Sequence, residues 1–170
     1  MSDRAQRLTA LLAAAEVDLL LVSDQVNLRY LTGYTGDNGL ALVGPGTRTF
    51  ITDFRYVEQA AEEVDPAFER RQAPLDLLDA IDDALPPGPV ALGFEDATVS
   101  VRSHARMREL LDERVTLVAA GSLVERLRAI KEPAEIARIR AAAALADEAL
   151  AALLSDGLIG RTERDLALAL

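Results

Sequence analysis

Short apolar runs alternate with helix-like segments as far as Ala120 of this 170-residue chain, and this alternation limits the fold most. Val17–Val22 reads VDLLLV, an almost continuous apolar run that is typical of a strand covered on both faces. Residues 39–43 and 48–52 are two further strand candidates, and the Gly44-Pro45-Gly46 sequence between them favours a hairpin. Strands are also expected at residues 90–94 and 115–119, with a brief edge strand at 68–72.

The intervals between these runs have helical periodicity. Apolar residues recur every three or four positions, which predicts helices over residues 3–15, 55–64, 74–85 and 100–111. In the third of these, Pro74 occupies a plausible first helical position, and the Pro86-Pro87 pair stops the helix. Helices that alternate with strands through short connections predict a small layered α/β domain with a mixed β-sheet flanked by helices.

The character of the chain changes after Ala120, where no further strand signal occurs. Ser122 and Glu125 form a capping-box pattern for a helix that ends near Ile130, and a longer helix is expected from Pro133 to Ser155. Thr162 with Asp165 begins another helix, within which the sequence ends at Leu170. We therefore expect a domain over residues 1–127, followed over 128–170 by a linker and the first helices of a second, truncated domain.

Composition excludes several classes of function. The net charge is −10, which disfavours nucleic acid as a partner, and the absence of cysteine excludes disulfides, thiolate metal sites and a cysteine nucleophile. No apolar run approaches the roughly 20 residues needed to span a bilayer, and the N-terminus lacks the apolar core of a signal peptide. These features predict a soluble, cytoplasmic protein with no membrane partner.

The residue types that perform catalysis do not form a recognisable pattern. His104 is the only histidine and lies among arginines in a predicted helix, where a surface or packing role is expected. The acidic pairs Glu62-Glu63 and Asp82-Asp83 point in different directions on a helix, so solvated faces are the better interpretation. No residue of the chain is therefore predicted to be catalytic or to bind a metal.

Two polar and aromatic clusters follow predicted strands, where sheet folds commonly place binding residues. The first is Asn27–Gly36, and the second is Thr52–Tyr56. A structural alternative stays open, in which Asn27 and Asp53 cap helices and the tyrosines of both clusters pack with their hydroxyls in water.

Three segments in order, NLRYLTGYTGDNG, TDFRYVEQA and LVERLRAIKEPAEIARIRAAAALAD, resemble those of Xaa-Pro aminopeptidases, Xaa-Pro dipeptidases and creatinases. The resemblance runs from Leu8 to Leu170. It implies that the first domain is the non-catalytic N-terminal domain of an M24-type metallopeptidase, and that residues 133–155 resemble the first helix of the catalytic, pita-bread domain. It also implies that five metal-binding residues, which hold two divalent ions such as Mn or Co, lie beyond this chain.

For the complete enzyme, the resemblance implies a homodimer that hydrolyses the peptide bond preceding proline in peptide substrates. The N-terminal domain is expected to serve dimerisation and to shape the substrate site, and this chain alone is expected to be inactive. Accessory contacts with substrate are expected from five residues, Tyr34, Asp37, Asn38, Arg55 and Tyr56. Two alternatives remain: a stand-alone binding or oligomerisation module, and the N-terminal domain of a creatinase-like C–N hydrolase.

Overall fold

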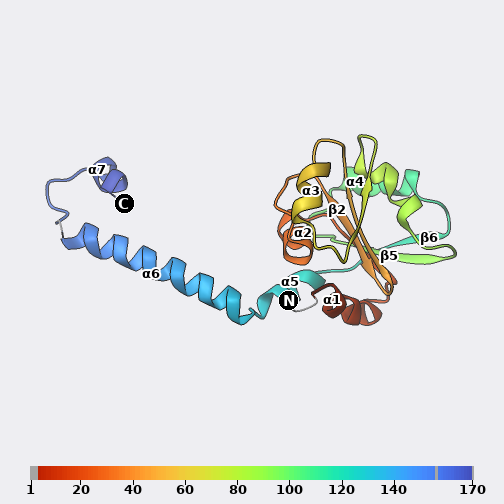
Figure 1. Cartoon of the computed structure of the whole chain (residues 1–170), viewed down its shortest axis with the longest axis horizontal. Coiled ribbons are helices and arrows are strands. Elements are labelled where there is room, and N and C mark those ends of the chain that lie inside the picture. The colour runs from red at the N-terminus through yellow and green to blue at the C-terminus, as the bar shows by residue number, and fades with distance from the viewer. Residues whose placement is uncertain (1–3, 156, 170) are drawn as a thin grey trace. The chain divides into compact units, whose positions relative to one another are not determined.

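A six-stranded mixed sheet forms the centre of the part of the chain up to Ala129 in the computed structural model, which describes residues 4–155 and 157–169 (Figure 1). Asp3 and Leu170, which the sequence placed in terminal helices, lie outside the described residues. The strand order is β4-β3-β2-β1-β5-β6. The strands are β1 (Leu19–Val22), β2 (Leu40–Gly44), β3 (Thr47–Thr52), β4 (Glu69–Gln72), β5 (Val90–Phe94) and β6 (Val115–Ala119). The predicted α/β class with a mixed sheet is confirmed.

Successive residues of the central strands face opposite sides of the sheet and enter two separate cores. Leu20 and Val22 pack in the first core, whereas Leu19 and Leu21 pack in the second. The first core is covered by α1 (Arg4–Leu12), α2 (Gln25–Thr32), α3 (Val57–Glu63) and α5 (Leu123–Ala129). The second is covered by α4 (Val101–Leu110) and the 3-10 turns η2 (Leu77–Ala80) and η3 (Asp82–Ala84). Helices on both faces explain why β1 is apolar at every position.

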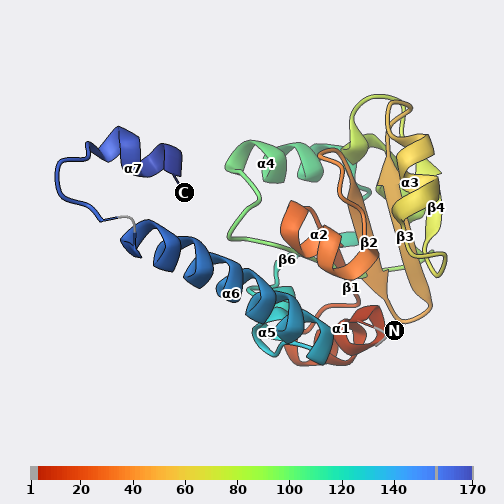
Figure 2. The ribbon, with the colours of Figure 1, turned by 60° about the vertical axis from the view of Figure 1, so that its left-hand side comes forward.

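The N-terminal helix α1 lies beside α5, the last helix of this layer (Figure 2). Leu8 and Leu12 of α1 are fully or almost fully buried, and Leu123 and Leu127 of α5 belong to the same core. A short 3-10 turn, η1 (Ala13–Ala15), ends α1 and leads into β1. Two segments more than 100 residues apart therefore close one face of the sheet together.

The expected hairpin joins β2 to β3. Gly44 pairs with Thr47, so Pro45 and Gly46 form a two-residue turn. Gly46 has a φ of 72°, a conformation that glycine adopts without the steric penalty of a side chain.

Helix α2 was not among the predicted helices, because residues 27–36 were interpreted as a polar and aromatic binding cluster. Only the structural alternative, in which Asn27 caps a helix, allowed one here. The residue that caps α2 is Asp24, whose side chain accepts hydrogen bonds from the backbone N–H groups of Val26 and Asn27. The suggestion that Asn27 caps a helix is therefore wrong.

The helix predicted over residues 74–85 is also wrong, since η2 and η3 occupy that segment. Asp76 caps η2 at Leu78, and the i to i+3 bond from the Ile81 N–H to the Leu78 carbonyl tightens the backbone. Ile81 and Leu85 of the expected apolar face are buried, but Leu75 of that face is 74% exposed and Leu77, outside it, is buried, so the helix type and part of the buried face differ from the prediction.

Contacts divide the chain into an α/β unit ending at Ala129 and a helical unit beginning at Ile130. The helical unit contains α6 (Pro133–Ser155) and α7 (Glu163–Ala169). Leu153 is the buried side chain of α6 among the described residues, while Ile139, Leu145 and Leu150 are exposed. No described helix combines the length and hydropathy that crossing a membrane requires.

Five strands of the α/β unit run parallel and β2 runs against them. The carboxyl ends of the five strands consequently meet at one edge of the sheet, which we call the carboxyl edge. The loop before β2, residues 33–39, reaches the same edge because β2 starts there.

Candidate functional site

The loop at residues 33–39 is held in place at its start by Tyr34 and Thr35, and at its end by a hydrogen bond of 2.6 Å from the Thr52 hydroxyl to the Asn38 carbonyl. Glu63 of α3 accepts hydrogen bonds from the backbone N–H of Thr35 at 2.7 Å and from its hydroxyl at 2.9 Å, and these bonds lower the pKa of Glu63. Tyr34 is 1% exposed and packs edge-on against Phe50, with ring centroids 4.8 Å apart. The loop backbone is therefore fixed rather than loosely attached.

Asp53, directly after β3, is the buried centre of a cluster at the carboxyl edge. Its carboxylate accepts hydrogen bonds from the Asn38 amide, from the Arg55 backbone N–H at 2.9 Å and from the Arg55 Nη2 at 2.6 Å. Asp53 is 0% exposed, and the Arg55 hydrogen bonds are the main reason that the pKa of Asp53 is lowered. The Asp53 carboxylate thus holds two side chains near each other: Asn38, from the loop before β2, and Arg55, from the segment after β3.

Asp37 and Tyr56 form the outer part of the same cluster. A hydrogen bond with the Asp37 carboxylate is the main cause that raises the pKa of Tyr56. The Arg55 guanidinium lies 5.4 Å from the centre of the Tyr56 ring, and the Tyr34 and Tyr56 rings are 6.5 Å apart. The Gln25 amide donates to the backbone carbonyl of Asp37 at 2.7 Å.

The structure brings all five predicted accessory residues together around Asp53. We call the six residues the carboxyl-edge cluster: Tyr34, Asp37, Asn38, Asp53, Arg55 and Tyr56. Asp37 is exposed and the Arg55 side chain is 58% exposed, whereas Tyr34 and Asp53 are buried. The arrangement presents an ion-paired arginine, a carboxylate and an aromatic ring on a buried support, which suits binding better than bond cleavage.

The alternative that assigned these residues purely structural roles is wrong in its details. Asp53 does not cap α3, because its carboxylate accepts from the Arg55 N–H and the N-cap residue of that helix is Tyr56, whose side chain makes no capping hydrogen bond. The Tyr34 hydroxyl donates to the Asn38 carbonyl at 3.4 Å. The Tyr30 hydroxyl is buried and meets no hydrogen-bond partner among the described residues.

Sequence reasoning missed a second polar network, which surrounds Glu95 at the end of β5. Glu95 is 4% exposed and accepts from the backbone N–H groups of Ser23 and Asp24, both at 2.7 Å, and from the Asn27 amide at 2.8 Å. Burial has the largest effect on the pKa of Glu95 and raises it.

Two residues of α5 complete this network. Glu125 accepts from the Asn27 side-chain amide, and the Arg128 guanidinium donates to the Asn27 side-chain oxygen Oδ1 at 2.8 Å. The partners are separated by 68 to 101 positions in the chain, so no local sequence motif indicates that they interact. The network ties α5 to the carboxyl ends of β1 and β5.

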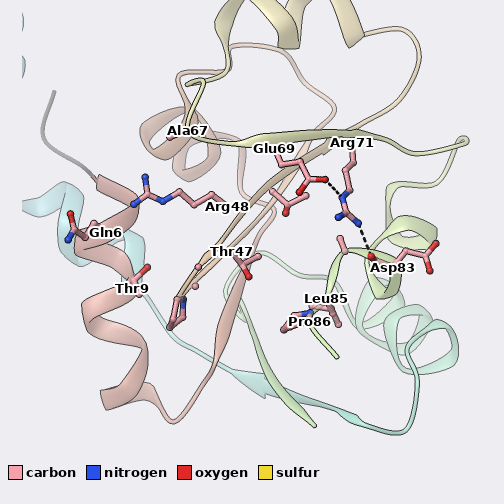
Figure 3. A pocket seen from close by; sticks show the side chains of 15 residues that line it. Gln6, Thr9, Thr47, Arg48, Ala67, Glu69, Arg71, Asp83, Leu85 and Pro86 are labelled. Carbon is pink, nitrogen blue, oxygen red and sulfur yellow. Dashed lines mark hydrogen bonds and ion pairs between the residues drawn. The ribbon is translucent and has the colours of Figure 1, made fainter. Parts of the chain in front are cut away.

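A cavity of 740 Å³ lies at the opposite edge of the sheet, beside the β2–β3 hairpin and the start of β4 (Figure 3). Arg71 within it donates to the Glu69 carboxylate at 2.8 Å and to the Asp83 carbonyl at 2.7 Å. These bonds occupy the guanidinium in structural contacts, and the Glu69 carboxylate offsets its charge. We find no arrangement for catalysis among the described residues of this cavity.

The metal pair expected of the complete enzyme does not fit the residues present. Within residues 4–155 and 157–169, no group of three or more acidic or histidine side chains could hold a metal ion. His104 lies against Phe94, with ring centroids 5.1 Å apart, and takes part in no such group. No chemical step of this chain is therefore assigned to a metal.

Comparison with known proteins shows which proteins this chain is similar to. Residues 4–130 match the sequence model of the Creatinase/Prolidase N-terminal domain. A Bacillus subtilis peptidase designated YqhT is 34% identical over 151 residues, which cover 88% of this chain and 42% of that protein.

Solved structures agree with this match. An Xaa-Pro dipeptidase from Bacillus anthracis superposes with a TM-score of 0.89 at 30% identity, covering 98% of this chain and 46% of the other. The N-terminal domain of the cytoplasmic peptidase PepQ from Mycobacterium tuberculosis gives a TM-score of 0.62 at 33% identity, covering 73% and 97%. This chain spans less than half the length of YqhT and of the dipeptidase.

Proposed function

The chain belongs to the creatinase/prolidase N-terminal domain family, and from this membership we propose that it is the non-catalytic accessory part of an Xaa-Pro aminopeptidase or dipeptidase. In this proposal the complete enzyme hydrolyses the bond preceding proline, and residues outside this chain hold two divalent ions such as Mn or Co. The structural relative PepQ from Mycobacterium tuberculosis is a cytoplasmic peptidase, and we propose the same location here.

The carboxyl-edge cluster is the observation that supports an accessory role in substrate binding. Its buried carboxylate, Asp53, uses its hydrogen bonds to orient Asn38 and Arg55. Side chains that are only structural need no exposed partner, yet Asp37 and much of Arg55 remain accessible. A preorganised polar surface of this kind can contact a peptide without losing further side-chain freedom.

The proposal includes a homodimer of the complete enzyme, in which the accessory unit shapes the substrate site. The helical unit supports association, because α6 exposes Ile139, Leu145, Leu150 and Leu154. Apolar side chains in that number on one helix are usually covered by another surface.

Kinetics of the complete enzyme test the accessory role. We expect replacement of Asp37 and Asn38 by Ala to raise KM for an Xaa-Pro peptide about tenfold, equivalent to ~1.4 kcal/mol, with a smaller change in kcat. The matched control replaces Thr47 and Arg48 by Ala at the opposite edge of the sheet and leaves KM unchanged. If the first variant folds and keeps the wild-type KM, the accessory role is wrong.

A further inference from the structure

The carboxyl edge contains a point where the chain departs in opposite directions from two neighbouring parallel strands. After β1 the chain enters α2, which packs in the first core, and after β5 it enters α4, which packs in the second. The carboxyl ends of such a strand pair border a crevice, and open α/β sheets commonly bind ligands there.

A cavity of 420 Å³ opens at this point on the α4 side of the sheet, within the range typical of ligand pockets. Leu21 and Leu40 form its floor on the sheet, and Leu78 and Met107 line its walls on η2 and α4. Asn38 of the carboxyl-edge cluster borders it as well. We call this cavity the switch-point pocket.

The lining of the switch-point pocket favours an uncharged ligand. Asp76 is its one charged residue among those described, and Asp76 is engaged in capping Leu78. The hydroxyls of Ser100 and Ser103 lie 2.8 Å apart, so one of them donates a hydrogen bond to the other. Neither hydroxyl is bonded to any other described side chain, so the second hydroxyl proton can be donated to a carbonyl oxygen.

Exposed apolar side chains surround the same edge. Leu75, which lines the pocket, is 74% exposed, and Val101, next to the lining residue Ser100, is 88% exposed. The other large exposed apolar side chains described before residue 130 also follow carboxyl ends of strands: Val26, Phe54 and Val57. Such a concentration on one edge marks an interaction surface rather than scattered surface residues.

We propose that the switch-point pocket binds a branched aliphatic side chain of a peptide, whose carbonyl oxygen accepts a hydrogen bond from the Ser100–Ser103 pair. The apolar floor excludes charged side chains, because a buried unpaired charge would be strongly unfavourable. This site goes beyond the accessory role of the carboxyl-edge cluster and does not depend on it, since it belongs to the α/β unit and binding needs no catalysis.

Nuclear magnetic resonance titration of this chain tests the site with N-acetyl-leucinamide as the probe. We expect saturable shifts at the backbone amides of Leu21, Leu40 and Met107, and no saturable shifts there with N-acetyl-aspartamide. Ser103→Trp, which fills the pocket, should abolish the shifts, whereas Arg102→Trp on the exposed side of the same helix should retain them. Leu75→Asp changes an exposed rim residue, so the fold is kept, and affinity should fall about fivefold.

The proposal fails if the wild-type chain shows no saturable shifts with the leucine probe. It fails equally if the leucine and aspartate probes bind alike, or if a folded Ser103→Trp variant binds as the wild type does. Should Ser103→Trp not fold, an unchanged affinity of Leu75→Asp overturns the proposal by itself. KM of the complete enzyme does not enter any of these outcomes.

Discussion

The α/β unit and the helical unit differ in how far they bury their apolar side chains. β1 buries Leu19, Leu20, Leu21 and Val22 to 2% exposure or less, between two layers of helices and turns. Helix α6 has 23 residues, yet Leu145 and Leu150 are 69% and 50% exposed. The sheet unit therefore contains the surfaces that stabilise it, whereas α6 depends on helix propensity until another surface covers it.

Matched leucine substitutions should show the largest difference between the two units. Leu20→Ala removes a fully buried side chain between two layers, and we expect the free energy of unfolding of the α/β unit to fall by about 3–5 kcal/mol. Leu145→Ala, at an exposed helical position, should change it by less than about 0.5 kcal/mol. Urea denaturation of both variants measures the difference, and equal losses would contradict the comparison.

The polar network inside the α/β unit should give an intermediate effect. Asn27→Ala leaves the buried Glu95 without one hydrogen-bond donor and removes the acceptor of Arg128. We expect a loss of about 2–3 kcal/mol, because the buried Glu95 carboxyl group loses a hydrogen-bond donor and the Arg128 guanidinium loses an acceptor. Val26→Ala on the exposed side of α2 is the matched control and should cost less than about 0.5 kcal/mol. A loss in Asn27→Ala no larger than in the control would show that the network is not stabilising.

A pH titration should reveal a smaller effect at Glu95. Burial raises the pKa of Glu95 in the folded protein, so the folded state binds this proton more tightly than the unfolded state does. The stability that Glu95 contributes is thus complete below the pKa of an ordinary glutamate, about 4.3, and is lost as pH rises through the raised pKa. Glu95→Gln lacks this loss.

Denaturation of both proteins from pH 4 to pH 8 measures the difference. We expect the wild type to lose stability relative to Glu95→Gln as pH rises. The opposite trend would show that the hydrogen bonds from Ser23, Asp24 and Asn27 outweigh burial and lower the pKa.

Whether a feature of the fold or of the candidate site could be predicted depends on how far apart in the sequence its determining residues lie. The strands over residues 90–94 and 115–119 follow from their own apolar runs, and the predicted bounds are those observed. The carboxyl-edge cluster was also predictable, because Asn38 precedes one strand and Asp53 follows another, and both therefore reach the same edge.

The failures have different physical causes. Apolar spacing in residues 74–85 is compatible with both an α-helix and successive 3-10 turns, so it did not decide between them. Asp24 was an available capping signal for α2, but the polar and aromatic residues that follow it also suit a binding segment. No local sequence pattern indicated the Glu95 network, because its residues come together only when the sheet has formed.

Hydrogen exchange at several protein concentrations tests the contrast between the two units most directly. We predict that amides of β1, β2 and β5 exchange slowly at every concentration, because their protection arises within one chain. Amides of α6 should be protected at high concentration and lose that protection on dilution, and Leu150→Glu should remove it altogether. Protection of α6 that equals that of the sheet and does not change on dilution would contradict the account.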